Sequence, residues 1–273
     1  MALPLAGKHC AIVGATGIIG TSIAKAFASH GAVLTLLSRS ILDAQPSFEK
    51  ELRKPQTSTA DKPPAIHRYI KLDVCQPDNV AATFRGLQNK DQAVGPVDIL
   101  INCAGISQTT LLKRTPDEEI RSVLDTNLLA TMLACKHAKV QPNGCIINIS
   151  SLMATKGAIG ATVYAASKAG VVGSYEPAKQ GTANANYLAQ GFTRALCLEM
   201  SARSIRVNAL LPGWVESPMW NNLKPDLKKE YLQATPLKRI ASPDEVADAA
   251  VFLATNQFAN NCVLNLDGGL SAS

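Results

Sequence analysis

The sequence predicts an α/β fold: one doubly wound domain, with a parallel sheet of about seven strands and helices on both faces. Short apolar runs rich in β-branched residues recur along the chain, and segments of helical length separate them. Strands that alternate with helices form parallel sheets, and right-handed crossovers make the doubly wound arrangement the default. The expected strands are His9–Val13, Ala32–Leu37, His67–Leu72, Asp98–Asn102, Cys145–Ile149, Ile205–Leu210 and Cys262–Asn265.

Length and composition narrow the class of protein. The chain has 273 residues, of which 47% are hydrophobic, so we expect residues 1–273 to form a single domain around one core. Its net charge of +6 is too small and too scattered to favour nucleic-acid binding, but it leaves room for an acidic small molecule or carrier protein. No signal peptide and no apolar stretch of about 18 residues is recognisable, so we expect no membrane partner.

The cysteines point to a reducing compartment. None of the seven forms a C-x-x-C pair, and no histidine cluster has the spacing of metal ligands. Thiols of this kind are typical of proteins from reducing compartments. We therefore expect no metal site, and a location in the cytoplasm or the mitochondrial matrix.

A glycine-rich segment directly follows the first expected strand. It reads Gly14-Ala-Thr-Gly17-Ile-Ile-Gly20 and precedes an apolar pattern of helical period. Glycines let the backbone approach a pyrophosphate, whose charge meets the amides of the helix N-terminus. The segment predicts a dinucleotide-binding (Rossmann-type) loop with Gly14, Gly17, Ile19 and Gly20 beside the phosphates. A plain strand-to-helix turn is the alternative.

The end of the second strand favours NADP(H) as the cofactor. Here Ser38 and Arg39 occupy the place where dinucleotide folds contact the adenosine ribose. An acidic residue would bind the 2′-hydroxyl, whereas an arginine with neighbouring hydroxyls suits a 2′-phosphate. A solvated arginine in a loop is the alternative for Arg39.

Three residues form a candidate catalytic group. Tyr164 and Lys168 stand four residues apart, which places them on one face of a helix. A phenol with a pKa near 10 is a poor proton donor and acceptor at neutral pH unless a nearby positive charge stabilises the phenolate. Ser151 closes an earlier strand, where its hydroxyl could bind a carbonyl oxygen as negative charge develops.

Taken together, these motifs resemble the short-chain dehydrogenase/reductase family over almost the whole chain. Further matching residues are Asp73 and Val74 after the third strand, Asn102, Ala104 and Gly105 after the fourth, Asn127, and Pro212 and Val215 after the sixth. The resemblance implies that Tyr164 is the general acid, Ser151 the carbonyl binder, Lys168 the ribose ligand that tunes the phenol, and Asn127 the holder of a proton-relay water. It also places Asp73 at the adenine and the segment Pro212–Val215 at the nicotinamide, which supplies the hydride.

Within that family, several stretches resemble 3-oxoacyl-acyl-carrier-protein reductases and the mitochondrial carbonyl reductase type. They are Leu111–Thr115, Thr126–Leu129, Pro236–Ile240, Asp244–Ala247 and Leu266–Gly269. The implied activity is NADPH-dependent reduction of a ketone, with a 3-oxoacyl thioester of fatty-acid or polyketide type as the first choice. Alternatives are an alcohol dehydrogenase or carbonyl reductase acting on another small or secondary-metabolite substrate, and a non-catalytic nucleotide-binding subunit. The implied assembly is a homo-oligomer, a dimer or a tetramer.

Two departures from the family pattern concern the loop and a helix. Ile18 occupies the position of the family's middle glycine, and the helix after Asn127 is expected to be short, ending near Val140. The substrate pocket is expected after Gly213, through Glu216, Met219, Trp220 and Leu223.

A third departure is the segment Ser174–Gly191, which contains Pro177, Gly181 and other poor helix formers. Without it, Gly173 would join Phe192 in the uninterrupted helix that the family shows. We therefore expect the insertion to break that helix and to weaken subunit contacts. The insertion is either a genuine loop or a translated in-frame intron. The intron alternative is possible because a GGT codon for Gly173 and a CAA codon for Gln190 would place GT and AG at the two ends of the segment.

Overall fold

The computed structural model describes residues 3–56, 65–87, 92–108, 110–172 and 191–272. Its sheet has seven strands in the order β3-β2-β1-β4-β5-β6-β7, and every neighbouring pair is parallel. Their bounds are β1 His9–Val13, β2 Val33–Ser38, β3 Arg68–Lys71, β4 Pro96–Asn102, β5 Lys139–Ile149, β6 Arg206–Pro212 and β7 Val263–Leu266. The expected doubly wound parallel sheet is confirmed.

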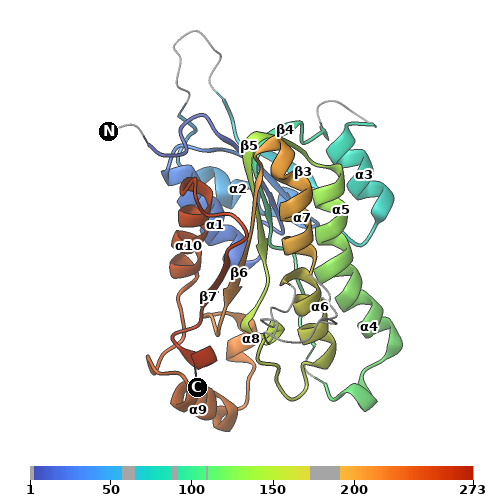
Figure 1. Ribbon diagram of the computed structural model, residues 1–273, viewed down its shortest axis with the longest axis vertical. Helices are drawn as coiled ribbons and strands as arrows, with labels where there is room; N and C mark the ends of the chain where they lie inside the picture. The colour runs from blue at the N-terminus through green and yellow to red at the C-terminus, as the bar shows by residue number, and fades with distance from the viewer. Residues whose placement is uncertain (1–2, 57–64, 88–91, 109, 173–190, 273) are drawn as a thin grey trace, which may run out of the picture.

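Helices cover both faces of the sheet (Figure 1). One face carries α1 Ile18–Ser29, α2 Ile41–Glu51 and α10 Pro243–Thr255, whose apolar residues pack with the strands in one core cluster. The other face carries α3 Pro77–Arg85, α5 Ala130–His137 and α7 Phe192–Met200, with a second cluster. Beyond the sheet's carboxyl edge lie α4 Asp117–Leu124, α6 Thr162–Val172, α8 Pro218–Asn221 and α9 Pro225–Ala234.

The central strands are mostly apolar because both faces of the sheet are covered, although β6 also carries the buried polar residues Arg206 and Asn208. All seven residues of β6 are buried, and four of the five residues of β1 are buried. Strands covered on both sides show continuous apolar runs instead of alternation. This is why these strands were the easiest elements to recognise in the sequence.

The order of the strands creates a switch point between β1 and β4. From β1 the chain proceeds to β2 and β3 on one side, and then returns to β4 on the other side. Loops at the carboxyl ends of such a neighbouring pair diverge and leave a crevice where ligands bind. The segment Gly14–Gly20 leaves β1 at this point, and Cys103–Gly105 leaves β4.

The region after Asn127 differs from the expectation. Helix α5 ends at His137, earlier than Val140, and β5 begins at Lys139 instead of Cys145. Its first residues pair with β4, and the register then shifts between Val97 and Ile99 at a bulge. The segment Pro142-Asn-Gly144 reads as a turn in the sequence, but Val140 is buried at 3% exposure and draws this part of the chain into the sheet.

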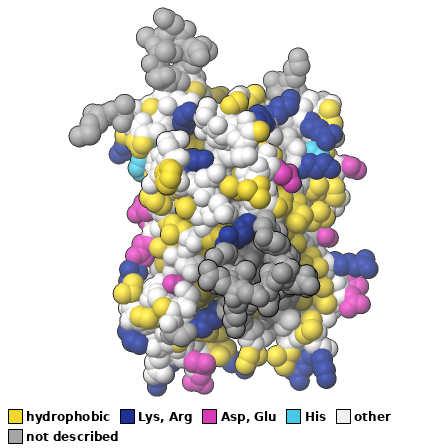
Figure 2. Space-filling view, in the orientation of Figure 1, with side chains coloured by type: hydrophobic (Ala, Val, Ile, Leu, Met, Phe, Trp, Pro, Cys, Tyr) yellow, Lys and Arg dark blue, Asp and Glu magenta, His cyan; other side chains and the backbone are white. Residues whose placement is uncertain are grey.

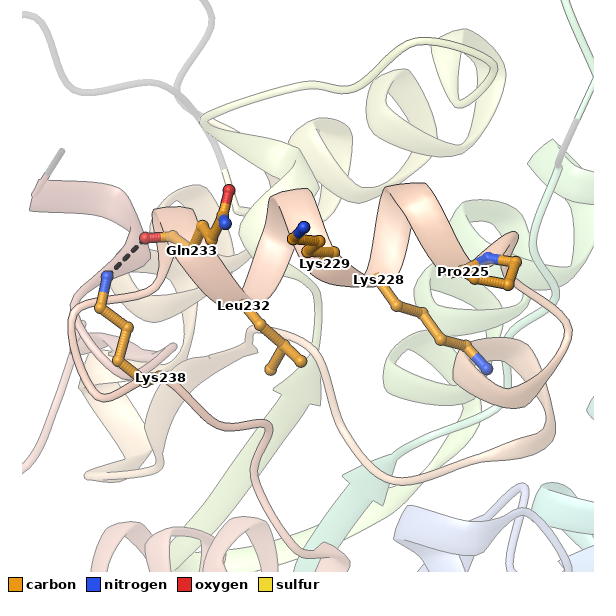
Figure 3. A pocket seen from close by; sticks show the side chains of 6 residues that line it. All are labelled: Pro225, Lys228, Lys229, Leu232, Gln233 and Lys238. Carbon is orange, nitrogen blue, oxygen red and sulfur yellow. Dashed lines mark hydrogen bonds between the residues drawn. The ribbon is translucent and has the colours of Figure 1, made fainter.

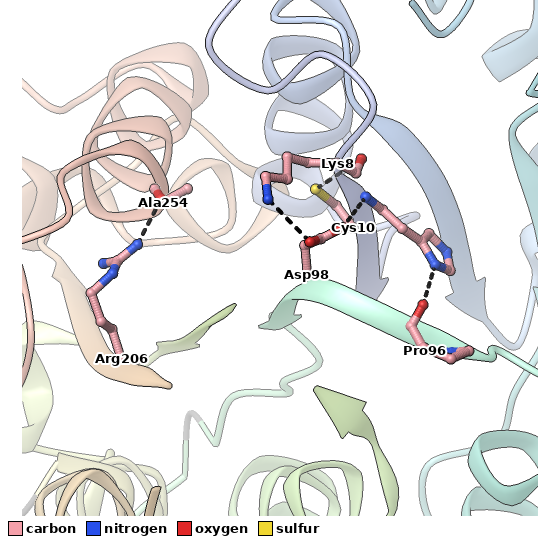
Figure 4. Close-up of polar contacts among 7 residues, drawn as sticks. Lys8, Cys10, Pro96, Asp98, Arg206 and Ala254 are labelled. Carbon is pink, nitrogen blue, oxygen red and sulfur yellow. Dashed lines mark hydrogen bonds and ion pairs between the residues drawn. The ribbon is translucent and has the colours of Figure 1, made fainter. Parts of the chain in front are cut away.

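Polar contacts at the amino edge of the sheet, opposite the switch point, are structural (Figure 4). Lys8 forms an ion pair with Asp98 over 3.2 Å, and the Asp98 carboxylate also accepts the backbone amide of His9. Buried Arg206 donates to the carbonyl oxygens of Leu253 and Ala254 at 2.7 Å each. These bonds satisfy carbonyls at the end of α10 that have no partner within the helix.

The segment Ser174–Gly191, except for Gly191, lies outside the described residues. The described part of α6 runs to Val172, and α7 begins at Phe192. The two helices are in contact, and Figure 1 shows α7 in line with α6. Whether residues 174–191 divide one helix into two stays a prediction, because residues 173–190 lie outside the described part of the chain.

Candidate active site

The glycine loop leaves no room for side chains at two of its positions. Gly14 has a φ of +83°, and a Cβ there would lie 2.5 Å from the amide nitrogen of Ala104. A Cβ on Gly20 would lie 2.3 Å from the carbonyl oxygen of Gly14. Gly17 precedes α1 as its N-cap, with Ile18 as the first helical residue. The loop therefore closes tightly against α1 although Ile18 replaces the family's middle glycine.

The end of β2 is hydrogen-bonded to this loop. The Thr16 hydroxyl donates to the Ser38 hydroxyl over 3.0 Å, and the Ser40 hydroxyl donates to Thr16 over 3.2 Å. Arg39 between them is exposed. The Leu72 amide donates to the Ser38 carbonyl oxygen, so Asp73 continues along the same edge. The residues expected at the adenosine end thus lie together beside the loop.

Tyr164, Lys168 and Ser151 converge at the other end of the crevice. Tyr164 and Lys168 both lie on α6, and the Lys168 ammonium is 5.9 Å from the centroid of the Tyr164 ring. The ammonium donates to the carbonyl oxygen of Ile149 over 3.0 Å. Ser151, which follows β5, is hydrogen-bonded to the phenol of Tyr164. The three groups therefore lie together at one end of the crevice.

Burial controls the protonation of this group. It raises the pKa of Tyr164 above its ordinary value, and the hydrogen bond with Ser151 only partly offsets this. Burial also lowers the pKa of Lys168 to about 8, and the nearby thiol of Cys103 partly opposes this effect. The lowering of the phenol's pKa that was expected from Lys168 is not found: burial raises that pKa, and Ser151 is the group that lowers it. Tyr164 consequently keeps its proton at neutral pH.

Asn127 lies in a π-helical turn, Asp125–Leu129, between α4 and α5. Single π turns inside helices are frequent at functional sites. The amide nitrogen of its side chain donates to the Ile106 carbonyl oxygen over 2.9 Å and to the Ser167 hydroxyl over 3.0 Å. Its side-chain oxygen accepts the Ile106 amide over 2.8 Å. Asn127 therefore connects the loop after β4 to α6.

Asn102 and Ala104 hold the elements around the cavity together. Asn102 is buried and donates to the Asn148 side-chain oxygen over 2.8 Å, and Asn148 in turn donates to Thr193 on α7 over 2.9 Å. The backbone of Ala104 packs against Gly14. Neither residue lines the cavity described next. Their place is in the framework that joins β4 to β5 and to the glycine loop.

One cavity of about 600 Å³ joins the glycine loop to the catalytic group. From the loop it includes Gly17–Gly20, and from the catalytic group Ser151, Tyr164 and Lys168. Gly105, Pro212 and Val215 also line it, whereas Gly14, Ser38, Arg39, Asp73, Val74 and Asn127 do not. A group at the nicotinamide end of a dinucleotide would therefore meet the phenol inside this cavity.

The far wall of the cavity is apolar and aromatic. Met219 and Leu223 line it as expected, but Glu216 and Trp220 do not: Glu216 is exposed, and Trp220 packs behind Trp214 with ring centroids 5.5 Å apart. Several further residues that line the cavity were not predicted from the sequence, namely Ile106, Gln108, Ile159, Leu227 and Tyr231. The spacing of Leu227 and Tyr231, four apart on α9, was a signal that could have revealed one helical face.

Helix α9 separates this cavity from the outside. Its residues Leu227 and Tyr231 face the cavity, and the Tyr231 ring lies 4.6 Å from that of Trp214, centroid to centroid. Its outer side forms an open hollow on the surface (Figure 3). The residues of this hollow, called here the α9 groove, are Pro225, Lys228, Lys229, Leu232, Gln233 and Lys238.

The described residues fit a bound nicotinamide dinucleotide. Gly17–Gly20 line the cavity at the N-terminus of α1, where backbone amides can meet a pyrophosphate. A Cβ on Gly105 would lie 3.3 Å from the Lys168 ammonium and 3.4 Å from the Asn127 side-chain oxygen, so glycine keeps this part of the site open. Among the described residues no group of histidine, cysteine or carboxylate side chains could hold a metal ion. None of the described helices is long and apolar enough to span a membrane.

Comparisons with known proteins agree with this geometry. A family model described as enoyl-(acyl carrier protein) reductase matches residues 14–271. The chain is 34% identical to 3-oxoacyl-acyl-carrier-protein reductase of Chlamydia muridarum, with 98% of each chain covered, and 35% identical to the human protein of the same name, covering 96% and 98%. It is 32% identical to carbonyl reductase family member 4 of Xenopus laevis, with 96% of this chain and 98% of that protein covered.

Solved structures give the same result. A short-chain dehydrogenase/reductase of Serratia marcescens, a double mutant, superimposes with a TM-score of 0.79 at 26% identity, covering 98% and 99% of the two chains. A structure described as a putative short-chain alcohol dehydrogenase from Sinorhizobium meliloti matches with a TM-score of 0.79 at 25% identity over both full lengths. The chain therefore belongs to the short-chain dehydrogenase/reductase family, as a nicotinamide-dependent enzyme that acts on alcohol and keto groups.

Proposed function

We propose that this enzyme reduces a 3-oxoacyl thioester to the 3-hydroxy product with NADPH, and that Tyr164 donates the proton. The observation that carries the proposal is the single cavity that joins Gly17–Gly20 to Ser151, Tyr164 and Lys168. In that cavity a carbonyl can reach the phenol and the cofactor at the same time.

The chemistry of these residues follows from their positions. Ser151 donates a hydrogen bond to the substrate carbonyl oxygen and stabilises the negative charge that develops on it. A bound nicotinamide supplies hydride to the carbonyl carbon. Tyr164 transfers its phenolic proton to the oxygen, so that the π bond of the carbonyl is replaced by one new C–H and one new O–H bond while the C–O single bond remains. Lys168 stabilises the phenolate that remains until solvent reprotonates it.

The protonation state of Tyr164 suits its proposed role as the acid in a reduction. Because the pKa of Tyr164 is raised, the phenol holds its proton at neutral pH and is ready to act as an acid. Oxidation of an alcohol would require the phenolate as the base, and this form becomes abundant only at high pH. The raised pKa therefore keeps Tyr164 in the protonated form that the proposed reduction needs at neutral pH.

The NADPH preference rests on the end of β2. Arg39 is exposed and lies next to Ser38 and Ser40, which are hydrogen-bonded to Thr16 of the glycine loop. A 2′-phosphate on the adenosine ribose would meet one guanidinium and these hydroxyls. A carboxylate at this edge, which would favour NADH, is absent from Ser38–Ser40.

The thioester substrate is supported by the apolar wall and by the α9 groove. The wall of Trp214, Leu223 and Leu227 suits an acyl chain. On the outer side of the same helix, the α9 groove carries Lys228, Lys229 and Lys238, whose positive charge complements an acidic carrier protein (Figure 3). The ammonium groups of Lys228 and Lys238 also donate to the carbonyl oxygens of Asn221 and Gln233. The relatives named above as reductases of acyl-carrier-protein substrates also support this choice.

The test compares substrates under one assay of NADPH absorbance. The parent enzyme should reduce an acetoacetyl thioester of a carrier protein with a lower KM than the N-acetylcysteamine thioester, and with a higher kcat/KM than a panel of simple ketones. Lys229→Glu should raise the KM for the carrier-bound substrate alone. Equal kcat/KM for simple ketones and thioesters would reject the thioester proposal.

A second candidate is a carbonyl reductase or alcohol dehydrogenase for an aromatic or bulky ketone. The cluster of Trp214 with Tyr231 at the cavity wall favours it. In that case aromatic ketones should outperform the thioesters in the same panel, and Lys229→Glu should have no effect on any substrate.

A further inference from the structure

Gln108 is a buried glutamine beside the active site, with 2% of its surface exposed. It lies three residues after Gly105, in the loop that leaves β4. Its side-chain oxygen accepts the backbone amide of Val163 over 2.7 Å and that of Tyr164 over 3.4 Å. Its side-chain nitrogen donates to the Thr110 carbonyl oxygen and to the Thr115 hydroxyl, both over 2.9 Å. All four hydrogen-bonding positions of this amide are thus in use.

The two amides that Gln108 accepts belong to the first turn of α6. Helix α6 begins at Thr162, so the amides of Val163 and Tyr164 are among those at a helix start that lack a partner within the helix. A buried amide without a partner costs about 1–3 kcal/mol. Gln108 supplies that partner from 55 residues earlier in the sequence. It therefore caps the helix that carries the phenol, at the turn where the phenol is attached.

The same loop holds α6 at a second level. Ile106 binds both ends of the Asn127 side chain, and Asn127 donates to Ser167 one turn further along α6. Gln108 and Asn127 thus fix two successive turns of the helix against one short loop. Because Tyr164 lies in the first turn, its position depends most directly on Gln108.

We propose that Gln108 is a positioning residue that holds Tyr164 at the substrate carbonyl by capping α6. The proposal rests on the proposed role of Tyr164. A glutamine suits this place because one end must accept from helix amides while the other must donate to Thr115. A carboxylate satisfies only the first requirement, and an alkyl side chain satisfies neither.

Displacement of the phenol would alter both the rate and its pH dependence. A shift of about 1 Å in a catalytic geometry can cost about a hundredfold in rate. Among the described residues, two titratable groups face the phenol: Lys168 on the same helix and Cys103 in the loop after β4. The Ser151 hydroxyl, which follows β5, also faces the phenol, and Cys103 acts on Lys168 as well. A phenol that moves away from Ser151 loses the hydrogen bond that lowers its pKa, so its titration should move to higher pH.

The experiment uses the full-length enzyme with NADPH and the best ketone substrate. Gln108→Met keeps the length of the side chain and removes its hydrogen bonds; we expect kcat to fall about 10- to 100-fold while the Kd of NADPH changes less than about twofold. The pH profile of kcat/KM should shift to higher pH. Gln108→Glu should shift the profile in the same direction, because it adds a negative charge near the phenolate. Gln257→Met, the same change at an exposed glutamine, is the control and should behave like the parent.

Thr115→Val tests the proposal independently, because it removes one anchor of the Gln108 amide without touching α6. It should lower kcat by a smaller factor and shift the pH profile in the same direction. The proposal is overturned if Gln108→Met folds and retains the parent's kcat and pH profile. If Gln108→Met does not fold, the same result for Thr115→Val overturns the proposal. Tyr164→Phe distinguishes failure of this proposal from failure of the proposed function. An inactive Tyr164→Phe beside a fully active Gln108→Met rejects only the role of Gln108. An active Tyr164→Phe rejects the proposed function.

Discussion

Replacing Lys168 by Met should remove the active site's largest electrostatic cost to folding. Lys168 is 4% exposed, and burial lowers its pKa from 10.5 to about 8. Methionine is unbranched and of similar length, so it should fill the same space with little repacking. The pH-dependent part of the change in stability therefore reports the cost of the buried charge.

The magnitude follows from linkage between protonation and folding. Between pH 8 and 10.5 the folded state binds fewer protons at Lys168 than the unfolded state does, so this contribution to stability rises with pH in that window. Below pH 8 the full penalty applies, about 3 kcal/mol for the shift from 10.5 to about 8. At pH 10 it has fallen to about 1 kcal/mol. Loss of the hydrogen bond to Ile149 costs about 1–3 kcal/mol in the variant, at every pH.

The assay is the free energy of unfolding from urea titrations at pH 7, 8, 9 and 10, without added nucleotide. The stability of Lys168→Met relative to the parent should fall by about 2 kcal/mol between pH 7 and pH 10. The variant should be nearly inactive and bind NADPH more weakly, since the ammonium also serves the ribose. Parallel stability curves for the two proteins over this range would refute the assignment of a strongly depressed pKa to Lys168.

Three further predictions concern the cofactor and the insertion. Arg39→Asp should reduce or reverse a preference for NADPH over NADH, because a carboxylate repels the 2′-phosphate; equal kcat/KM with both cofactors in the parent would remove the case for Arg39. Gly20→Ala should weaken NADPH binding at least about tenfold, because its Cβ would meet the Gly14 oxygen at 2.3 Å, whereas Gly17→Ala places its Cβ 3.4 Å from that oxygen and should cost less, as measured by fluorescence titration. Deletion of 174–191 should join α6 to α7 and give a more active enzyme and a stronger oligomer, as measured by size-exclusion chromatography. A less active, monomeric deletion variant would favour a genuine functional loop. A Gly173 codon other than GGT would reject the intron hypothesis.

Much of the fold could be read from the sequence because parallel strands covered on both faces are continuously apolar. The strand β1, the glycine loop and the start of α1 are adjacent in the sequence, so the pattern of a phosphate-binding turn was visible without tertiary information. Tyr164 and Lys168 are likewise related by one helical turn. Short-range spacing was sufficient for both motifs.

The boundaries of β5 and α5 could not be read in the same way. Pro142-Asn-Gly144 carries the local signal of a turn, yet Val140 before it pairs with Val97 and is buried. Pairing with a neighbouring strand outweighs local turn propensity, and no sequence window shows which strand will be that neighbour.

The sequence by itself determined the parallel α/β class, the dinucleotide loop and the candidate group of Ser151, Tyr164 and Lys168, because each depends on periodicity or on residues close together in the chain. Only the tertiary structure decided which residues line the substrate cavity, how burial shifts the protonation of Tyr164 and Lys168, and that Gln108 caps α6. These properties depend on desolvation and on contacts between segments some 55 residues apart, which arise only when the chain has packed.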